Sequence, residues 1–195
     1  SGNIAGDGNL VLSVYYTRNS YTVETAYNNE KAGTVTAGGT YKYETQLTLT
    51  ATTNAGYTFN GWYDGKTLVS EAEEFTIKVD KNVTYTAVWS ANLDTPYTVE
   101  YYVKEKGASD YALYETVQQQ GETDTNVTAE IKEYSSYTYD EAKSAGTISG
   151  VIAGDGSLVL KGYYAYDVSQ VPTLAFEAIE GGAEYKVVGI GDYES

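Results

Sequence analysis

The sequence predicts a mainly β protein that consists of small antiparallel sheets in tandem, with little helix. Apolar residues alternate with threonine, lysine and glutamate through most of the chain, a pattern typical of strands that bury one face. β-branched and aromatic residues fill these runs, and tyrosine alone accounts for 22 of the 195 residues. A long segment also occurs twice, which indicates repeated units.

The repeated segment suggests where units begin and end. Residues 1–16, SGNIAGDGNLVLSVYY, return as residues 149–164, SGVIAGDGSLVLKGYY, with 12 of 16 positions identical. The tetrapeptide YTVE follows the first copy at 21–24 and begins the stretch that ends in the second copy at 97–100. We therefore expect YTVE to start a unit and the longer segment to close one, so that residues 1–20 are the C-terminal hairpin of a truncated upstream repeat.

A strand at residues 10–16 would carry a strongly apolar face without the sheet that it closes. An isolated hairpin is only marginally stable in water, and an unpaired apolar edge recruits partners. We therefore expect this segment either to pack on the following domain or to pair with another molecule. Weak self-association through residues 1–20 is the partner prediction that follows.

Residues 21–92 are predicted to form the first complete domain. Alternation places Leu47, Leu49 and Ala51 on one face of a strand, and the runs at 75–79 and 83–89 behave in the same way around a turn at 80–82. Phe59 and Trp62 are three residues apart, which would place them on opposite faces of a regular strand. Because Asn60-Gly61 has the composition of a bulge, both rings are expected to point inward.

Residues 93–166 are predicted to form the second domain, and residues 167–195 a linker and β-hairpin leading towards a further domain. Alternating strands are expected at 97–103 and 126–131, and the chain offers barely one helical turn at 140–144. Pro96 and Pro172 each follow the last strand of a unit and mark the joints. In the tail, two apolar runs flank Gly181-Gly182, which predicts a hairpin.

The motif IAGDG is expected to be a hairpin turn, between a strand at 149–152 and a return strand at 158–160. A calcium site would need several oxygen ligands at alternating spacing, whereas Asp7 and Asp155 each stand alone. Turn chemistry is therefore the favoured interpretation of both aspartates, and no metal site is predicted.

The composition excludes many kinds of chemistry. The chain has no histidine and no cysteine, so imidazole-based catalysis, thiol nucleophiles, disulfides and zinc or iron–sulfur sites are absent. A net charge of −15 argues against nucleic acid as a partner, and no apolar run approaches the roughly 20 residues of a membrane span. We predict no enzyme activity, no cofactor and no membrane insertion.

Tyrosines that face outward are the candidate ligand-binding residues. Inward rings such as Tyr97 and Tyr101, and the two tryptophans Trp62 and Trp89, are expected to pack in cores. Exposed rings could instead stack on sugars. The candidates are Tyr15, Tyr102 and Tyr163.

Three segments resemble modules of bacterial surface proteins. GYTFNGWYDG (56–65), FTIKV and TYTAVW resemble the divergent internalin B-repeat, over about 21–91. YTVEYYV with the DGSLVLKGYY ending resembles the mucin-binding-protein repeat of Gram-positive adhesins, over about 97–166. EYKVVGIGDY (184–193) resembles the segment that leads into surface leucine-rich repeats. The resemblance implies β-grasp-like domains and an extracellular location at the cell surface or cell wall.

The function predicted from the sequence is that of non-catalytic spacer or stalk modules in a bacterial cell-surface protein. The alternative is an adhesin module that binds host or dietary glycan or mucin, as the second resemblance implies. A glycoside hydrolase with paired carboxylates is a third hypothesis, and a less favoured one because small sheet domains offer no deep pocket. Its candidate acids are Asp64, Glu71, Glu73, Glu74, Asp140 and Glu141.

Overall fold

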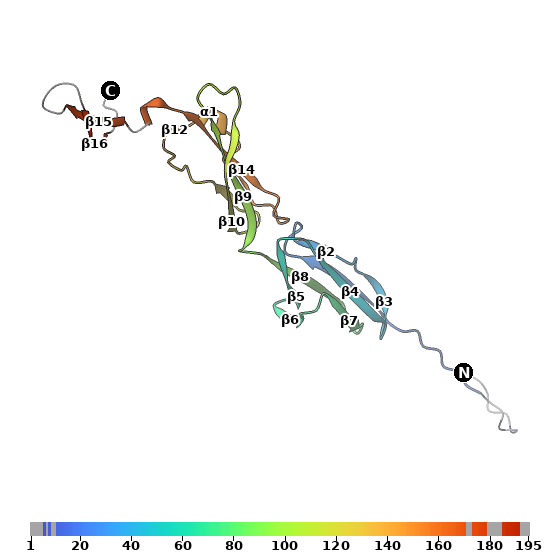
Figure 1. Ribbon diagram of the computed structural model, residues 1–195. Coiled ribbons are helices and arrows are strands. Elements are labelled where there is room, and N and C mark those ends of the chain that lie inside the picture. Colours follow the sequence, from blue (N-terminus) through green and yellow to red (C-terminus); the bar gives the residue numbers. More distant parts are fainter. Residues whose placement is uncertain (1–5, 7, 9–10, 171–172, 179–184, 192–195) are drawn as a thin grey trace. The chain divides into compact units, whose positions relative to one another are not determined.

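The computed structural model describes residues 6, 8, 11–170, 173–178 and 185–191, and these residues are mainly strand (Figure 1). The chain divides into two compact units: Ser1–Thr53 with Phe59–Ser90, and Asn54–Thr58 with Ala91–Ser195. The mainly β fold predicted from the sequence is confirmed. The domain limits predicted at 20/21, 92/93 and 166/167 stay predictions.

The first unit contains two sheets. One has the strand order β3-β1-β8-β5-β6, and the other has the order β2-β4-β7. The strands are β1 (Ser20–Tyr27), β2 (Gly33–Val35), β3 (Gly39–Lys42), β4 (Gln46–Thr53), β5 (Tyr57–Asp64), β6 (Thr67–Ser70), β7 (Glu74–Lys78) and β8 (Val83–Ala91).

The first and last strands of this unit pair in parallel. The β1–β8 register runs from Val23 opposite Val83 to Tyr27 opposite Ala87. The pairs β1–β3, β2–β4, β4–β7 and β5–β6 are antiparallel. The sheet is therefore mixed. The long connection between β1 and β8 lets β8 lie beside β1 in the same direction, which a short hairpin could not do.

Aromatic rings and small apolar side chains form the core between the two sheets. Trp62 is 0% exposed and Trp89 is 3% exposed. The Phe59 ring contacts both indoles, with centroid distances of 6.2 Å to Trp62 and 5.5 Å to Trp89. Gly61 has φ +128°, and the β5–β6 register shifts between Trp62 and Tyr63. The predicted irregularity is present next to Gly61, and both rings lie on the core side.

Gly33 shows how closely the backbone approaches this core. A Cβ atom built there would lie 2.2 Å from the Thr52 carbonyl oxygen and 2.8 Å from the Trp89 ring. The Trp89 indole is itself held in place, because its Nε1 donates to the Thr53 hydroxyl at 2.8 Å. Only glycine fits at position 33 without a shift of the backbone.

The second unit also has a main sheet and a smaller one. Its main sheet has the order β10-β9-β14-β12, and β11 pairs with β13 in a covering layer. The elements are β9 (Thr95–Lys104), β10 (Ala112–Gly121), β11 (Asn126–Thr128), β12 (Tyr137–Tyr139), α1 (Glu141–Ser144), β13 (Ser149–Val151), β14 (Val159–Tyr166) and the 3-10 turn η1 (Val168–Gln170).

Here too the first and last long strands, β9 and β14, are parallel neighbours (Figure 1). Their inner face buries a tyrosine-rich core: Val99, Tyr101, Val103, Ala129, Leu160 and Tyr164. The single predicted helical turn is present as α1, and the Asp140 carboxylate accepts the Lys143 backbone N–H at 2.9 Å, which caps it.

The IAGDG motif forms the expected turn but not the expected hairpin. Gly156 donates its N–H to the Ala153 carbonyl, and the Asp155 carboxylate accepts the Ser157 N–H at 3.0 Å, as turn chemistry requires. However, β13 pairs with β11 and β14 pairs with β9 and β12. The prediction that the two strands pair with each other was wrong, because each pairs with a strand of a different sheet.

The N-terminal copy of the repeated segment differs from the second copy over residues 11–16, which the structure describes. Residues 11–19 contain no strand, and Val14, Tyr15 and Tyr16 are exposed, so the predicted strand is not observed there, and the segment is not packed on the following domain. Residues 1–5, 7, 9 and 10 lie outside the described part. In β14 the same sequence is held between two strands with Leu160 and Tyr164 each 1% exposed. Pairing with another molecule stays a prediction.

The tail contains the two predicted strands. β15 (Thr173–Ala178) and β16 (Tyr185–Gly191) pair antiparallel with a register shift at Ala175/Phe176. The Gly181-Gly182 turn itself lies outside the described residues.

Candidate functional site

Two of the three candidate tyrosines meet on the outer face of the second unit's main sheet. Tyr102 of β9 and Tyr163 of β14 are direct register partners across the parallel pair. Their rings stack with centroids 5.2 Å apart and an interplanar angle of 24°. Tyr15 belongs to the first unit, where it is 91% exposed on the segment without a strand.

A third ring, Tyr111, completes what we call the outer tyrosine cluster: Tyr102, Tyr111 and Tyr163. Tyr111 lies in the connection between β9 and β10, and its ring meets Tyr163 edge-on at 5.1 Å. All three side chains are half-buried. The cluster therefore covers part of a sheet face that no other layer of the described residues covers, and leaves ring edges accessible.

Lysine side chains lie over the faces of these rings. Lys161 Nζ is 5.5 Å from the Tyr102 centroid, and Lys143 Nζ is 5.4 Å from that of Tyr163. Lys104 and Lys143 lie on Tyr111, at 5.9 and 6.0 Å. Contacts of this kind are worth about 0.5–1 kcal/mol at exposed sites.

Carboxylates fix the ring hydroxyls. Tyr102 donates to Glu100 at 2.7 Å, and Glu100 also lies 3.6 Å from Lys161. Tyr111 donates its hydroxyl proton to Asp140, the residue that caps α1. Burial of the ring and this hydrogen bond raise the pKa of Tyr111 to about 12. The Tyr111 hydroxyl therefore stays protonated at neutral pH and donates its hydrogen bond to Asp140.

A hollow adjoins the cluster at the β9–β10 connection. It has a volume of about 350 Å³, and its lining includes Lys104, Glu105, Lys106, Tyr111, Asp140 and Tyr166. The Lys106 ammonium lies 5.9 Å from the centroid of the Tyr166 ring. Aromatic walls, ammonium groups and carboxylates converge here from β9, β14 and the connecting loops.

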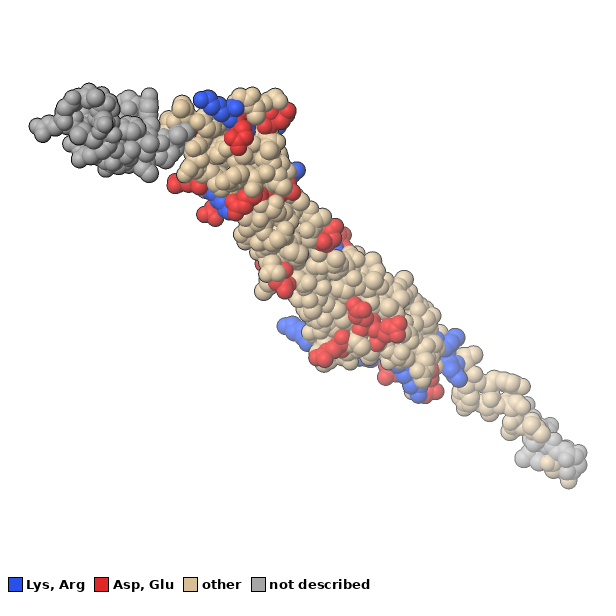
Figure 2. All heavy atoms as spheres, viewed as in Figure 1, with Lys and Arg blue, Asp and Glu red and all other residues tan. Residues whose placement is uncertain are grey.

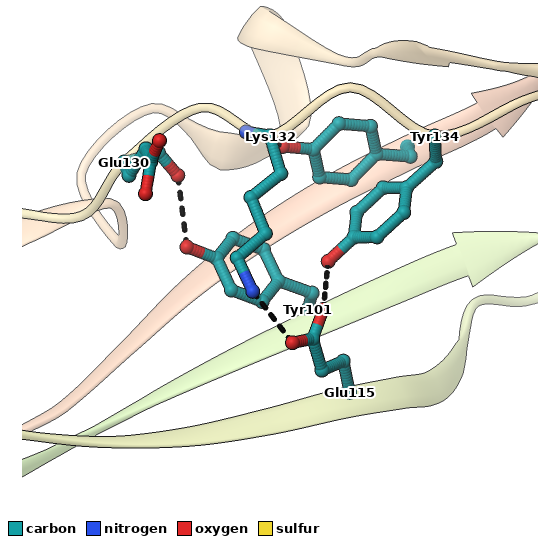
Figure 3. A network of polar contacts seen from close by, with 6 residues as sticks. Tyr101, Glu115, Glu130, Lys132 and Tyr134 are labelled. Atoms are coloured by element: carbon teal, nitrogen blue, oxygen red, sulfur yellow. Dashed lines mark hydrogen bonds and ion pairs between the residues drawn. The ribbon is translucent and has the colours of Figure 1, made fainter.

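The inner face of the same sheet carries a polar network that fastens the covering segment at residues 129–134 (Figure 3). Tyr101 donates to the Glu130 carbonyl at 2.9 Å, and Lys132 Nζ lies 2.5 Å from Glu115 and 4.7 Å from the centroid of the Tyr101 ring. Tyr134 donates to the other oxygen of Glu115 at 2.5 Å. The hydrogen bond from Lys132, together with that from Tyr134, lowers the pKa of Glu115. Since every polar group in it is paired within the unit, this network is structural.

The first unit has a polar groove of about 630 Å³ between the ends of β1, β5 and β8. Its side chains bond to one another: Lys81 to Asp64 at 2.8 Å and Thr84 to Glu24 at 3.1 Å. A ligand would have to break these pairs.

The structure also bears on the hydrolase hypothesis, on metal binding and on membrane spans. The carboxylates proposed for a hydrolase are divided between the units: Asp64, Glu71, Glu73 and Glu74 belong to the first, and Asp140 and Glu141 to the second. Within the described residues no group of three or more acidic, histidine or cysteine side chains is placed to hold a metal ion. No helix in that part of the chain is long and apolar enough to cross a membrane.

Sequence reasoning placed Tyr102 and Tyr163 on the outer face but missed Tyr111 and the lysines. Tyr102 and Tyr163 follow from alternation along strands whose inward residues are Tyr101 and Tyr164. Tyr111 lies in an irregular loop, where periodicity says nothing. The sequence shows only a tyrosine among polar loop residues at this position, and that does not predict a contact with Tyr163, 52 residues further along the chain.

Part of the chain is similar to a known protein family. Residues 22–93 match the family model of the divergent InlB B-repeat domain, a family associated with surface proteins. The match covers the strands from β1 to β8. No curated protein matches the chain. The resemblances of residues 97–166 and 184–193 to other surface modules stay predictions.

Proposed function

We propose that the two units are non-catalytic spacer modules of an extracellular protein on the surface or wall of a Gram-positive bacterium. The observation that carries this proposal is the parallel pairing of the first and last strands in each unit, β1 with β8 and β9 with β14. Two parallel strands side by side place the start of the first and the end of the second at opposite ends of the sheet. Each unit therefore passes the chain from one end to the other.

The length gained per unit follows from the strands. β8 has 9 residues and β9 has 10, and at about 3.3 Å per residue a strand of this size spans roughly 30 Å. An antiparallel first and last strand would return the chain to its starting end. Repetition of the present arrangement adds a fixed length with each module, which is what a spacer requires.

Two observations support an extracellular setting: residues 22–93 match a family associated with surface proteins, and the composition is acidic. On the face shown in Figure 2, acidic and fewer basic side chains are dispersed over a largely uncharged surface. A chain with net charge −15 repels its own copies, which suits modules that stay apart at high surface density.

A distance measurement within one unit tests the proposal. Spin labels on cysteines in place of Asn19 and Ser90, both exposed, would mark the start of β1 and the end of β8 in a chain that has no other cysteine. The register predicts a separation of roughly 30–35 Å. A separation near the ~5 Å spacing of neighbouring strands would contradict the spacer geometry.

Binding of glycan or mucin is a second candidate function, favoured by the position of the outer tyrosine cluster on a sheet face open to solvent. The variant Tyr163→Ala separates the roles. If the rings only reinforce the β9–β14 pair, the variant loses about 0.5–1.5 kcal/mol of stability and a glycan array stays silent for both proteins. Binding by the native chain that the variant loses would favour the adhesin function.

A further inference from the structure

We propose that the hollow between the β9–β10 connection and Tyr166 binds an acidic saccharide, a sugar ring that carries a carboxylate or a sulfate. The inference rests on the second candidate function, glycan binding, and specifies where the glycan binds and that it carries a negative charge. The hollow's volume of about 350 Å³ falls within the range of small-ligand sites, at its lower end.

Three lysines beside this hollow have no carboxylate partner within ion-pair distance among the described residues: Lys104, Lys106 and Lys143. Elsewhere in the described part, lysines at 78, 81, 132 and 161 each pair with a carboxylate. The three instead lie over tyrosine rings, Lys104 and Lys143 on Tyr111 and Lys106 on Tyr166. Against the two carboxylates of the lining, Glu105 and Asp140, these three ammonium groups leave one positive charge in excess, in a chain with 27 acidic and 12 basic residues.

The two carboxylates in the lining are already engaged. Asp140 accepts the Tyr111 hydroxyl and the Lys143 backbone N–H. Glu105 accepts the Tyr137 hydroxyl at 2.7 Å. These bonds hold both carboxylates in place and leave them charged. The three lysine ammonium groups form no ion pair with a carboxylate of the described residues, so they can turn to a bound anion. Charge-assisted hydrogen bonds of this kind are roughly twice as strong as neutral ones.

The tyrosine rings that line the hollow favour a ligand with a sugar ring. Tyr111 and Tyr166 are both half-buried and line the same hollow. A bare phosphate or sulfate would use the lysines but leave these rings uncovered. A pyranose has an apolar face that covers a ring and substituents that reach the ammonium groups, so it uses both halves of the site.

The test compares ligands that differ only in charge. Oligogalacturonate and its methyl ester share the same rings, as do dextran sulfate and dextran. Binding to the full chain is measured by calorimetry and by tyrosine near-ultraviolet circular dichroism at low and moderate salt. We expect the charged member of at least one pair to bind, its uncharged counterpart to bind at least tenfold more weakly, and affinity to fall as salt rises.

The variant Lys104→Gln/Lys106→Gln locates the site. It is expected to lose at least tenfold in affinity, whereas Lys66→Gln, an exposed lysine of the first unit, should bind like the native chain. Equal binding of the uncharged ligands would overturn the acidic preference but leave glycan binding standing. Inorganic phosphate that competes at equal concentration would overturn the saccharide. If the charged and neutral ligands are all silent, this site and the adhesin function both fail, and the spacer function is untouched.

Discussion

Pulling the chain from its two ends should load the parallel pairs of both units in shear. The strands β1 and β8 lie side by side in the same direction, so a force on their outer ends acts along the strands and across all their hydrogen bonds at once. The same holds for β9 and β14. Each unit should therefore resist until its parallel pair breaks and then unfold in one step.

The size of that step follows from the residue numbers. Residues 20–91 and residues 95–166 each comprise 72 residues. Fully extended, 72 residues reach about 26 nm, and the folded unit already spans about 3 nm. Single-molecule force spectroscopy should record two steps of about 23 nm each. The β9–β14 register is the longer of the two, so the second unit should yield at the higher force.

A second pulling geometry provides the control. Handles attached at residues 19 and 43 would pull on the antiparallel β1–β3 pair, whose outer ends are joined by the bond from Tyr43 N–H to the Asn19 carbonyl. That pair opens one bond at a time and should yield at a clearly lower force. Equal forces in the two geometries, or several small steps in place of two, would refute the load-bearing role of the parallel pairs.

Three further predictions concern stability. Gly33→Ala should lower the free energy of unfolding by about 2–3 kcal/mol, because its Cβ would meet a carbonyl oxygen and an indole ring. The red shift of tryptophan emission that reports unfolding should then occur at a lower denaturant concentration. Gly39→Ala is the control: its Cβ would meet only the end of a tyrosine side chain, and the change should stay within about 0.5 kcal/mol. Because the pKa of Glu115 is lowered in the folded unit, its contribution is present above the ordinary value of 4.5 and is lost as pH falls below it; Glu115→Gln should flatten the acid side of a stability–pH curve. Burial raises the pKa of both Tyr101 and Tyr111 to about 12, so their neutral forms stabilise the fold below pH 10.0. This contribution is lost as the pH rises from about 10 to 12. An ultraviolet titration in which all tyrosines ionise near pH 10 while the chain stays folded would contradict this prediction.

Local patterns in the sequence determined the strands and their faces. Alternation placed Tyr102 on one side of β9 and Tyr101 on the other, and the composition of Asn60-Gly61 marked the irregularity that turns Phe59 and Trp62 to the same side. The period of two is a property of a few consecutive residues, so it can be recognised without knowledge of the fold. The absence of histidine and cysteine likewise limited the available chemistry from composition alone.

Only the tertiary structure decided which strands are neighbours. The segments at 10–16 and 158–164 are nearly the same sequence, yet the second forms β14 between two partners and residues 11–16 form no strand. The same reason explains why β13 and β14 do not form a hairpin, why Tyr111 reaches Tyr163, and why the first and last strands run parallel. A strand's hydrogen bonds are made with another part of the chain, so pairing depends on contacts that no local pattern contains.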